Sequence, residues 1–263
     1  MDGASVNTAG GGELRPRRAE RPRRKASFFG VVGEILITAG VITLLYVTWQ
    51  LWIGDVIYGA ERNAEGASLS EQWESDYLTA PEPTAAPDPE PATAEPVILP
   101  QPEDAQIFAT MRIPRFGADY NVPIAGGVTR ARTLDTIGIG HYPGAQMPGE
   151  VGNFALAAHR TTWGKPFNRI ADLHVGDAII VETEAGWYTY RYRTLEYVTP
   201  TQVEVLLPVP EQPGVPAGGK YITLTSCSPM FAMTERIVAY GLFESFTPRT
   251  SGPPTSLTEG PTT

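Results

Sequence analysis

Residues 221–243 read YITLTSCSPMFAMTERIVAYGLF and hold two apolar, β-branched runs joined by a short, more polar segment. The first run, Tyr221–Thr225, leads into Cys227, and the second, Ile237–Phe243, begins directly after Arg236. Such runs are typical of strands, and a turn between antiparallel strands brings the residue after the turn back beside the residue before it. We therefore expect Cys227 and Arg236 to lie close together on neighbouring strands.

Four other stretches have the same β-branched and aromatic composition and are bounded by Gly, Pro, Asn or Asp. They are Phe108–Ile113, Phe154–Ala158, Ala178–Glu182 and Tyr188–Arg193. Glu184-Ala185-Gly186 predicts a hairpin between the last two. Arg130–Thr136 and Lys165–Leu173 predict short helical turns. Residues 103–247 are thus expected to form a mainly β domain, a barrel or sandwich with one or two small helices.

An apolar segment precedes this domain. Residues 28–54 carry no charge between Ile35 and Trp49, and aromatic residues gather at their far end. The twenty-six residues 28–53 would form a helix about 39 Å long, which exceeds the hydrocarbon core of a bilayer at ~30 Å. Residues 1–27 hold seven Arg or Lys against three acids, so they are predicted to be a cytoplasmic basic tail. We expect a single-pass anchor in the cell membrane with an extracytoplasmic domain; a cleaved signal peptide is the alternative.

The flanks carry the net charge of −9, whereas residues 105–247 are nearly neutral, which argues against nucleic-acid binding. Residues 55–102 are predicted to be an acidic, Pro-rich linker with a short helix over Arg62–Tyr77. Residues 248–263 have the composition of a disordered tail.

Cys227 is the only cysteine, so the chain can form no intramolecular disulfide and no multi-cysteine metal site. A strand end can hold a nucleophile rigidly beside a cleft. Burial as a structural cysteine is the alternative. A free thiol outside the cytoplasm is exposed to oxidation and is usually paired, which favours a functional role.

A cysteine nucleophile needs a proton partner. His159 follows the strand-like run NFALAA and has the same strand-end placement as Cys227, whereas His141 and His174 lie in Gly-containing loops. Acyl transfer also needs a donor for the developing oxyanion, and the guanidinium of Arg236 offers a planar fork of donors. Arg160 is the rival for this role because it adjoins His159.

Three stretches resemble a known family. GHYPGAQMPGEVGNFALAAHR at 140–160, TLTSC at 223–227 and ERIVAYG at 235–241 look like a membrane-anchored sortase transpeptidase. The family signature at the nucleophile is Thr-Leu-x-Thr-Cys, and Ser226 here replaces the second Thr while keeping a hydroxyl. The resemblance is greatest to class E, the actinobacterial housekeeping group.

The resemblance implies an eight-stranded sortase β-barrel and a cysteine transpeptidase that needs no cofactor. The substrate would be a secreted protein with a C-terminal sorting signal, Leu-Ala-x-Thr-Gly or Leu-Pro-x-Thr-Gly, cleaved between Thr and Gly. Cys227 would form a thioester, His159 would move the proton, and Arg236 would hold the carbonyl oxygen or the substrate backbone. The acceptor would be an amine of a lipid-linked peptidoglycan precursor.

The loop Gly140–Gly144 precedes the strand that leads to His159 and predicts one wall of the pocket. The Tyr142 hydroxyl can donate to a substrate backbone carbonyl, and packing beneath the loop is the alternative. His141, Thr225 and Ser226 are the other predicted substrate-binding residues. An Ala in the second signal position keeps an amide N–H that Pro lacks, so a site with a group for that N–H would prefer Ala.

Other functions remain open at this stage. An L,D-transpeptidase also places a histidine before its cysteine, but usually within Ser-His-Gly-Cys, and a papain-like peptidase reverses the order. A non-enzymatic, anchored β-domain that binds a wall polymer would make Cys227 dispensable.

We expect no metal, because the carboxylates that might bind calcium are scattered along the sequence. These are Asp172, Asp177, Glu182 and Glu184.

Overall fold

The computed structural model describes residues 27–49, 53–80 and 94–258, and divides into two units, Met1–Tyr46 and Val47–Thr263. The basic tail before residue 27, the Pro-rich stretch 81–93 and the last five residues lie outside the described residues. Helix α1, Phe28–Thr48, is about 32 Å long at 1.5 Å per residue. Its mean hydropathy of 2.2 and its length make it a candidate membrane span, which ends before the predicted limit at residue 54.

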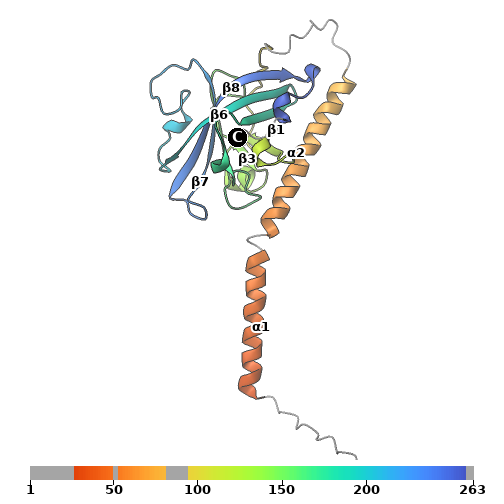
Figure 1. The fold of residues 1–263 in the computed structure, drawn as a ribbon, viewed down its shortest axis with the longest axis vertical. Helices are drawn as coiled ribbons and strands as arrows, with labels where there is room; N and C mark the ends of the chain where they lie inside the picture. Colours follow the sequence, from red (N-terminus) through yellow and green to blue (C-terminus); the bar gives the residue numbers. More distant parts are fainter. Residues whose placement is uncertain (1–26, 50–52, 81–93, 259–263) are drawn as a thin grey trace, which may run out of the picture. The chain divides into compact units, whose positions relative to one another are not determined.

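The larger unit is built on eight strands that close into a barrel (Figure 1). The strands are β1 Ile107–Arg112, β2 Val122–Gly126, β3 Ile139–His141, β4 Gly152–Ala158, β5 Ala178–Thr183, β6 Gly186–Val198, β7 Lys220–Ser228 and β8 Glu235–Pro248. Their order around the barrel is β1-β2-β3-β4-β7-β8-β6-β5. The β2–β3 and β4–β7 pairs are parallel and the others antiparallel. The expected mainly β fold and the eight-stranded barrel are confirmed.

Alternation along each strand fills the barrel with apolar side chains. Ile124, Ile139, Leu156, Ile179, Tyr190, Leu224 and Ile237 are all at most 1% exposed. The predicted hairpin joins β5 to β6, with Thr183 opposite Gly186. Strands β2 and β3 were not among the six predicted runs because they have only five and three residues and contain Pro123 and Gly140. Of the two predicted helical turns, the structure has Arg130–Leu134 and the shorter Ile170–Asp172.

The structure differs from the predicted linker most clearly at helix α2, which runs from Gly54 to Thr79. It is far longer than the expected helix over 62–77, and it packs against β1, β2 and β5. A Cβ on Gly66 would lie 2.1 Å from the Asn121 carbonyl oxygen, so this close approach requires glycine. The first half of the predicted linker is therefore an ordered helix attached to the barrel.

The predicted disordered tail also differs, because residues up to 258 are ordered. Pro248 ends β8, and short helical turns follow at Arg249–Ser251 and Thr255–Leu257. The Arg249 side chain is buried and donates to Glu182 Oε1 at 3.1 Å and to the Thr183 carbonyl. Arg112 Nε and Ser70 Oγ of α2 bind the other oxygen of Glu182 at 3.2 and 2.9 Å. This buried cluster joins the tail, the barrel and α2.

Candidate active site

A cleft of about 510 Å³ lies at one end of β4, β7 and β8. Cys227 is half-buried in its wall. The cleft is lined by side chains from these strands and from the loops that follow them, among them Tyr142, His159, Arg160, Thr225, Ser226, Cys227, Phe231, Met233 and Arg236. Six of the seven predicted site residues thus line one cleft, and His141 is the exception.

Cys227 and Arg236 occupy opposite positions in the antiparallel β7–β8 pair, as the spacing of the two runs predicts. The Arg236 guanidinium is held by its own turn, where Nη1 donates to the Glu235 carbonyl at 2.9 Å and to the Met233 carbonyl at 3.2 Å. These bonds use one nitrogen of the fork. The other donors of the guanidinium can serve a substrate oxygen.

His159 reaches the cleft by the parallel pairing of β4 with β7. Ala157 pairs with Thr225, and His159 and Cys227 each follow two residues further on, so they lie at the same level of these neighbouring strands. His159 Nε2 lies 2.6 Å from Asp135 Oδ1. Nδ1 is then the ring nitrogen that can exchange a proton in the cleft, because the carboxylate fixes the proton of the neutral ring on Nε2.

Sequence reasoning missed Asp135. It follows the turn Arg130–Leu134, and the parallel β2–β3 pairing brings this segment to the end of β4. Its side chain is 18% exposed, and Arg130 Nε lies 3.6 Å from the same oxygen at the surface. Nothing in the local sequence marks an aspartate 24 residues before the histidine as its partner.

Arg160 is more buried than Arg236, the other arginine beside the cleft, and it contacts the backbone of the nucleophile rather than its thiol. Its Nη1 donates to the Cys227 carbonyl at 3.5 Å. Its Nε is buried and has no hydrogen-bond partner among the described residues. The contact with the backbone of β7 indicates that Arg160 supports the strand end that carries the cysteine.

The hydroxyl groups beside the cleft form a directed chain. Thr225 donates to the Leu156 carbonyl at 3.1 Å, and Ser226 donates to the Ala158 carbonyl at 2.8 Å. Tyr142 Oη lies 3.0 Å from Thr225 Oγ1. Because Thr225 has only one proton and gives it to β4, Tyr142 must be the donor in this bond. Tyr142 can therefore accept a proton from a substrate N–H, whereas the predicted donation to a substrate carbonyl would require breaking this bond.

His141 does not lie in the cleft, contrary to its predicted substrate-binding role. Its ring is 1% exposed, stacks on Phe154 and contacts the edge of Phe108. Nε2 bonds the Gln146 carbonyl at 3.0 Å. Burial lowers the pKa of His141, so the ring is neutral inside the barrel. His174 is exposed in a turn and is not part of the cleft lining.

No group of three or more His, Cys, Asp or Glu side chains in the described part of the chain could hold a metal ion. Three of the four carboxylates considered for calcium form ion pairs with arginines. Asp177 forms an ion pair with Arg115, Asp172 with Arg169, and Glu182 with the two arginines of the buried cluster. The chemistry that the cleft supports is that of a thiol, an imidazole and a guanidinium.

The fold and the cleft together define a class: closed eight-stranded β-barrels with a cysteine, a histidine and an arginine at neighbouring strand ends. A family model of the sortase domain matches residues 111–244. Sortase SrtE1 of Streptomyces coelicolor is 36% identical over 249 residues, which cover 92% of this chain and 65% of SrtE1. Sortase SrtE2 of the same organism is 31% identical over 242 residues, covering 90% and 88%.

Solved structures agree with the sequence comparison. The SrtA sortase from Actinomyces oris superposes with a TM-score of 0.60 at 36% identity, covering 65% of this chain and 98% of that one. A crystal structure of Sortase E1 from S. coelicolor with a tripeptide in its active site gives 0.55 at 39% identity, covering 58% and 97%. The chain belongs to the sortase family, and it is similar to sortases of class E.

Sortases are cysteine transpeptidases that act on substrates with a sorting signal. Membership of this family removes the L,D-transpeptidase and papain-like alternatives. The single cysteine of the chain is the one that lies in the cleft.

Proposed function

We propose that this chain is a membrane-anchored transpeptidase that cleaves a C-terminal sorting signal between Thr and Gly. It would join the new carboxyl end to an amine of a lipid-linked peptidoglycan precursor. The observation that carries the proposal is the meeting of Cys227, His159 and Arg236 at the ends of three adjacent strands in one cleft.

The first half-reaction begins with a Cys227 thiolate and a protonated His159. The sulfur attacks the carbonyl carbon of the signal Thr, and the bond from that carbon to the Gly nitrogen breaks. His159 gives the proton on Nδ1 to the departing amine, which leaves a thioester on Cys227 and a neutral imidazole. In the second half-reaction the acceptor amine attacks the thioester and passes a proton to His159, and the thiolate leaves.

Asp135 supports this cycle because its carboxylate faces Nε2 throughout and favours the charged imidazole that each half-reaction requires. Arg236 is opposite Cys227 and is the residue we assign to the oxyanion or the substrate backbone. Arg160 is assigned to the support of the Cys227 backbone rather than to the oxyanion.

The hydroxyl chain supports a preference for Ala in the second position of the signal. Tyr142 gives its proton to Thr225, so its oxygen lone pairs are directed to accept. The amide N–H of Ala can donate to this oxygen, and Pro has no such group. We therefore assign Leu-Ala-x-Thr-Gly as the better substrate and Tyr142 as the residue that recognises the amide N–H of the second signal residue.

We infer that α1 is the anchor and that the barrel is extracytoplasmic, because seven basic residues precede the apolar helix. Protease added to intact protoplasts should remove the barrel and leave a fragment that contains residues 1–27. Complete protection of the barrel, with cleavage only after lysis, would reverse the orientation.

The activity is tested with the full chain in detergent micelles. It is incubated with Leu-Ala-x-Thr-Gly and Leu-Pro-x-Thr-Gly peptides and an oligoglycine amine, and the products are identified by mass. We expect cleavage between Thr and Gly and a product joined to the amine, with loss of both in Cys227→Ala and His159→Ala. His174→Ala is the matched histidine control and should retain activity. Ligation by Cys227→Ala would refute the thioester mechanism.

A further inference from the structure

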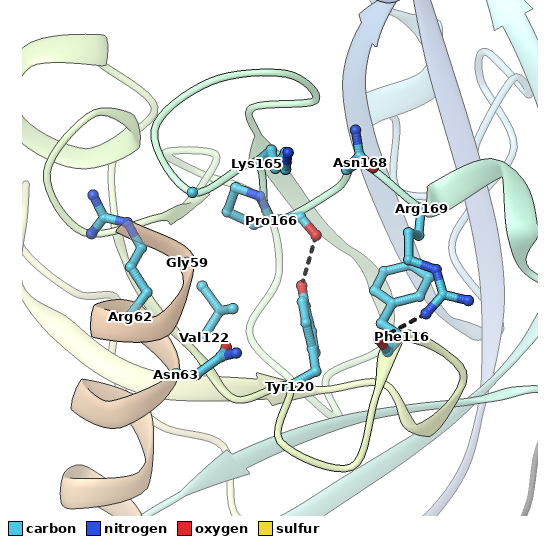
Figure 2. A pocket seen from close by; sticks show the side chains of 11 residues that line it. Gly59, Arg62, Asn63, Phe116, Tyr120, Val122, Lys165, Pro166, Asn168 and Arg169 are labelled. Carbon is cyan, nitrogen blue, oxygen red and sulfur yellow. Dashed lines mark hydrogen bonds between the residues drawn. The ribbon is translucent and has the colours of Figure 1, made fainter. Parts of the chain in front are cut away.

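Arg62 of helix α2 makes contacts that the proposed reaction does not yet use. Arg62 is 6% exposed, and Figure 2 shows its side chain extending from α2 at the edge of a pocket that it lines together with Val122 and Pro166. Its guanidinium donates from Nη2 to the Asp135 carbonyl at 2.8 Å and from Nη1 to the Thr136 carbonyl. Nε points to the Trp163 carbonyl at 3.5 Å.

These acceptors lie on both sides of the bond between Asp135 and His159. Asp135 and Thr136 belong to the segment that supplies the carboxylate, and Trp163 belongs to the loop that begins at His159. A planar fork that donates to two consecutive carbonyls fixes the orientation of the peptide between them. Arg62 thus holds the backbone of the aspartate and reaches toward the backbone that follows the histidine.

The environment of Arg62 shows that this position is closely fitted. A Cβ on Gly138 would come within 3.1 Å of the Arg62 Cδ, so the chain just after Thr136 passes close to the side chain. A buried guanidinium is costly unless it is hydrogen-bonded, and here its partners are backbone carbonyls rather than a carboxylate. The observed bonds therefore constrain the segment 135–136 as well as satisfying the charge.

We propose that Arg62 is a positioning residue for the reaction: it holds Asp135 against Nε2 of His159 and thereby sets the orientation and tautomer of the ring. This rests on the proposed function. In the sequence, α2 follows α1 with five residues, 49–53, between the two helices. The direct alternative is that Arg62 only attaches α2 to the barrel.

Ser70 provides the matched control. It lies two turns further along α2 and also bonds the barrel, donating to Glu182 Oε2 at 2.9 Å and accepting from Asn121 Nδ2 and Arg112 Nη2, each at 3.2 Å. None of these partners contacts Asp135 or His159 through a hydrogen bond in the described residues. Ser70→Ala should therefore weaken the attachment of α2 without reaching the ring.

The experiment compares the full chain in micelles, labelled with ¹⁵N-histidine, with its Arg62→Met, Arg62→Lys and Ser70→Ala variants. The chain has only three histidines, so each ring can be assigned by substitution. Ring nitrogen shifts report the tautomer, thermal unfolding reports stability, and peptide ligation gives kcat and KM as a function of pH.

In Arg62→Met we expect the His159 ring signals to move, while those of His141 and His174 stay. We expect kcat to fall roughly 10- to 100-fold with little change in KM, as for a misplaced proton-transfer group. Arg62→Lys should recover part of both effects, and it serves as the test if Arg62→Met fails to fold.

Ser70→Ala should unfold at lower temperature but keep the His159 ring signals and the pH profile. The proposal is overturned if both Arg62 variants keep the wild-type ring signals and lose only stability, as Ser70→Ala does. Absence of ligation by the wild-type chain would refute the proposed function instead. The ring signals would still decide whether Arg62 positions His159.

Discussion

The carboxylates of Glu182 and Asp135 are held in contrasting ways within the same barrel. Glu182 is 2% exposed and is surrounded by Arg112, Arg249 and the Ser70 hydroxyl, all of which are permanent donors. Asp135 is 18% exposed and bonds His159, which lines the cleft. Both carboxylates are fixed by short contacts with cations or hydroxyls, so geometry alone does not separate their roles.

The chemistry of their partners distinguishes the roles of Glu182 and Asp135. An arginine keeps its proton at every pH at which the protein is folded, so the Glu182 cluster can only hold elements together. A histidine can give a proton to a substrate and take one back, so the Asp135 pair can take part in proton transfer. A carboxylate in this barrel is therefore structural where its cationic partners are permanent, and chemical where its partner can exchange a proton.

Within this comparison, the largest loss of activity is expected from removing the charge of Asp135. Asp135→Asn keeps the size of the side chain but no longer favours the charged imidazole, so kcat/KM for peptide ligation should fall on the order of 10²-fold. The thermal midpoint should change little, because the side chain is partly exposed to solvent. Initial rates and melting curves on one preparation test both statements. Wild-type rates in Asp135→Asn would remove the chemical role from this carboxylate.

Glu182→Gln should lower the stability of the fold and leave the rate of ligation unchanged. It removes the buried countercharge of Arg249 and leaves only the half-exposed Glu74, 3.5 Å from Nη1, and loss of a buried partner typically costs about 3–5 kcal/mol of unfolding free energy. The rate per folded molecule should stay at the wild-type value. Asp172→Asn is the control, because its pair with Arg169 is exposed and should contribute less than about 1 kcal/mol. Denaturant titrations measure these changes, and equal losses in both variants would contradict the structural role of the Glu182 cluster.

Arg236→Lys extends the comparison to the cations. The Arg249 guanidinium donates to groups of the barrel, whereas Arg236 donates to its own turn through Nη1 and has further donors that can face the cleft. A lysine retains the charge but loses the planar geometry, so kcat should fall about 10-fold while KM changes less. Steady-state ligation kinetics provide the test, with Arg160→Lys measured beside it. A normal Arg236→Lys and an impaired Arg160→Lys would exchange their roles.

The smallest effect concerns Tyr142. Tyr142→Phe removes the acceptor for the amide of the second signal residue, which should reduce the preference for Ala over Pro by on the order of 1 kcal/mol. That corresponds to about a fivefold change in the ratio of kcat/KM for the two peptides. Competition between the peptides in one reaction measures this ratio directly. An unchanged ratio would place the selection elsewhere, for example in the loop between Val198 and Gly219.

Local patterns predicted the parts of this molecule that depend on short-range order. The β7–β8 pair with Cys227 and Arg236, and the placement of His159 at a strand end, follow from β-branched runs and one turn. The eight-stranded closure came from the family resemblance, because β2 and β3 are too short to stand out.

Long-range contacts explain what local patterns did not predict. Asp135 reaches His159 through a parallel strand pair, and His141 is drawn inside by stacking on Phe154. Helix α2 looks like a linker by composition, yet Gly66 and Arg62 fit it to the barrel. Each of these depends on a partner distant in sequence, and neither periodicity nor charge counts reveal such partners.

The proposed mechanism requires a thioester between Cys227 and the carbonyl of the signal Thr. The most direct measurement is the intact mass of the full chain after rapid mixing with a Leu-Ala-x-Thr-Gly peptide and acid quenching, followed by mapping of the modified residue. We predict an added mass equal to the peptide up to and including Thr, located on Cys227 and released by hydroxylamine. Peptide cleavage without this adduct, or an equal adduct in Cys227→Ala, would contradict the account.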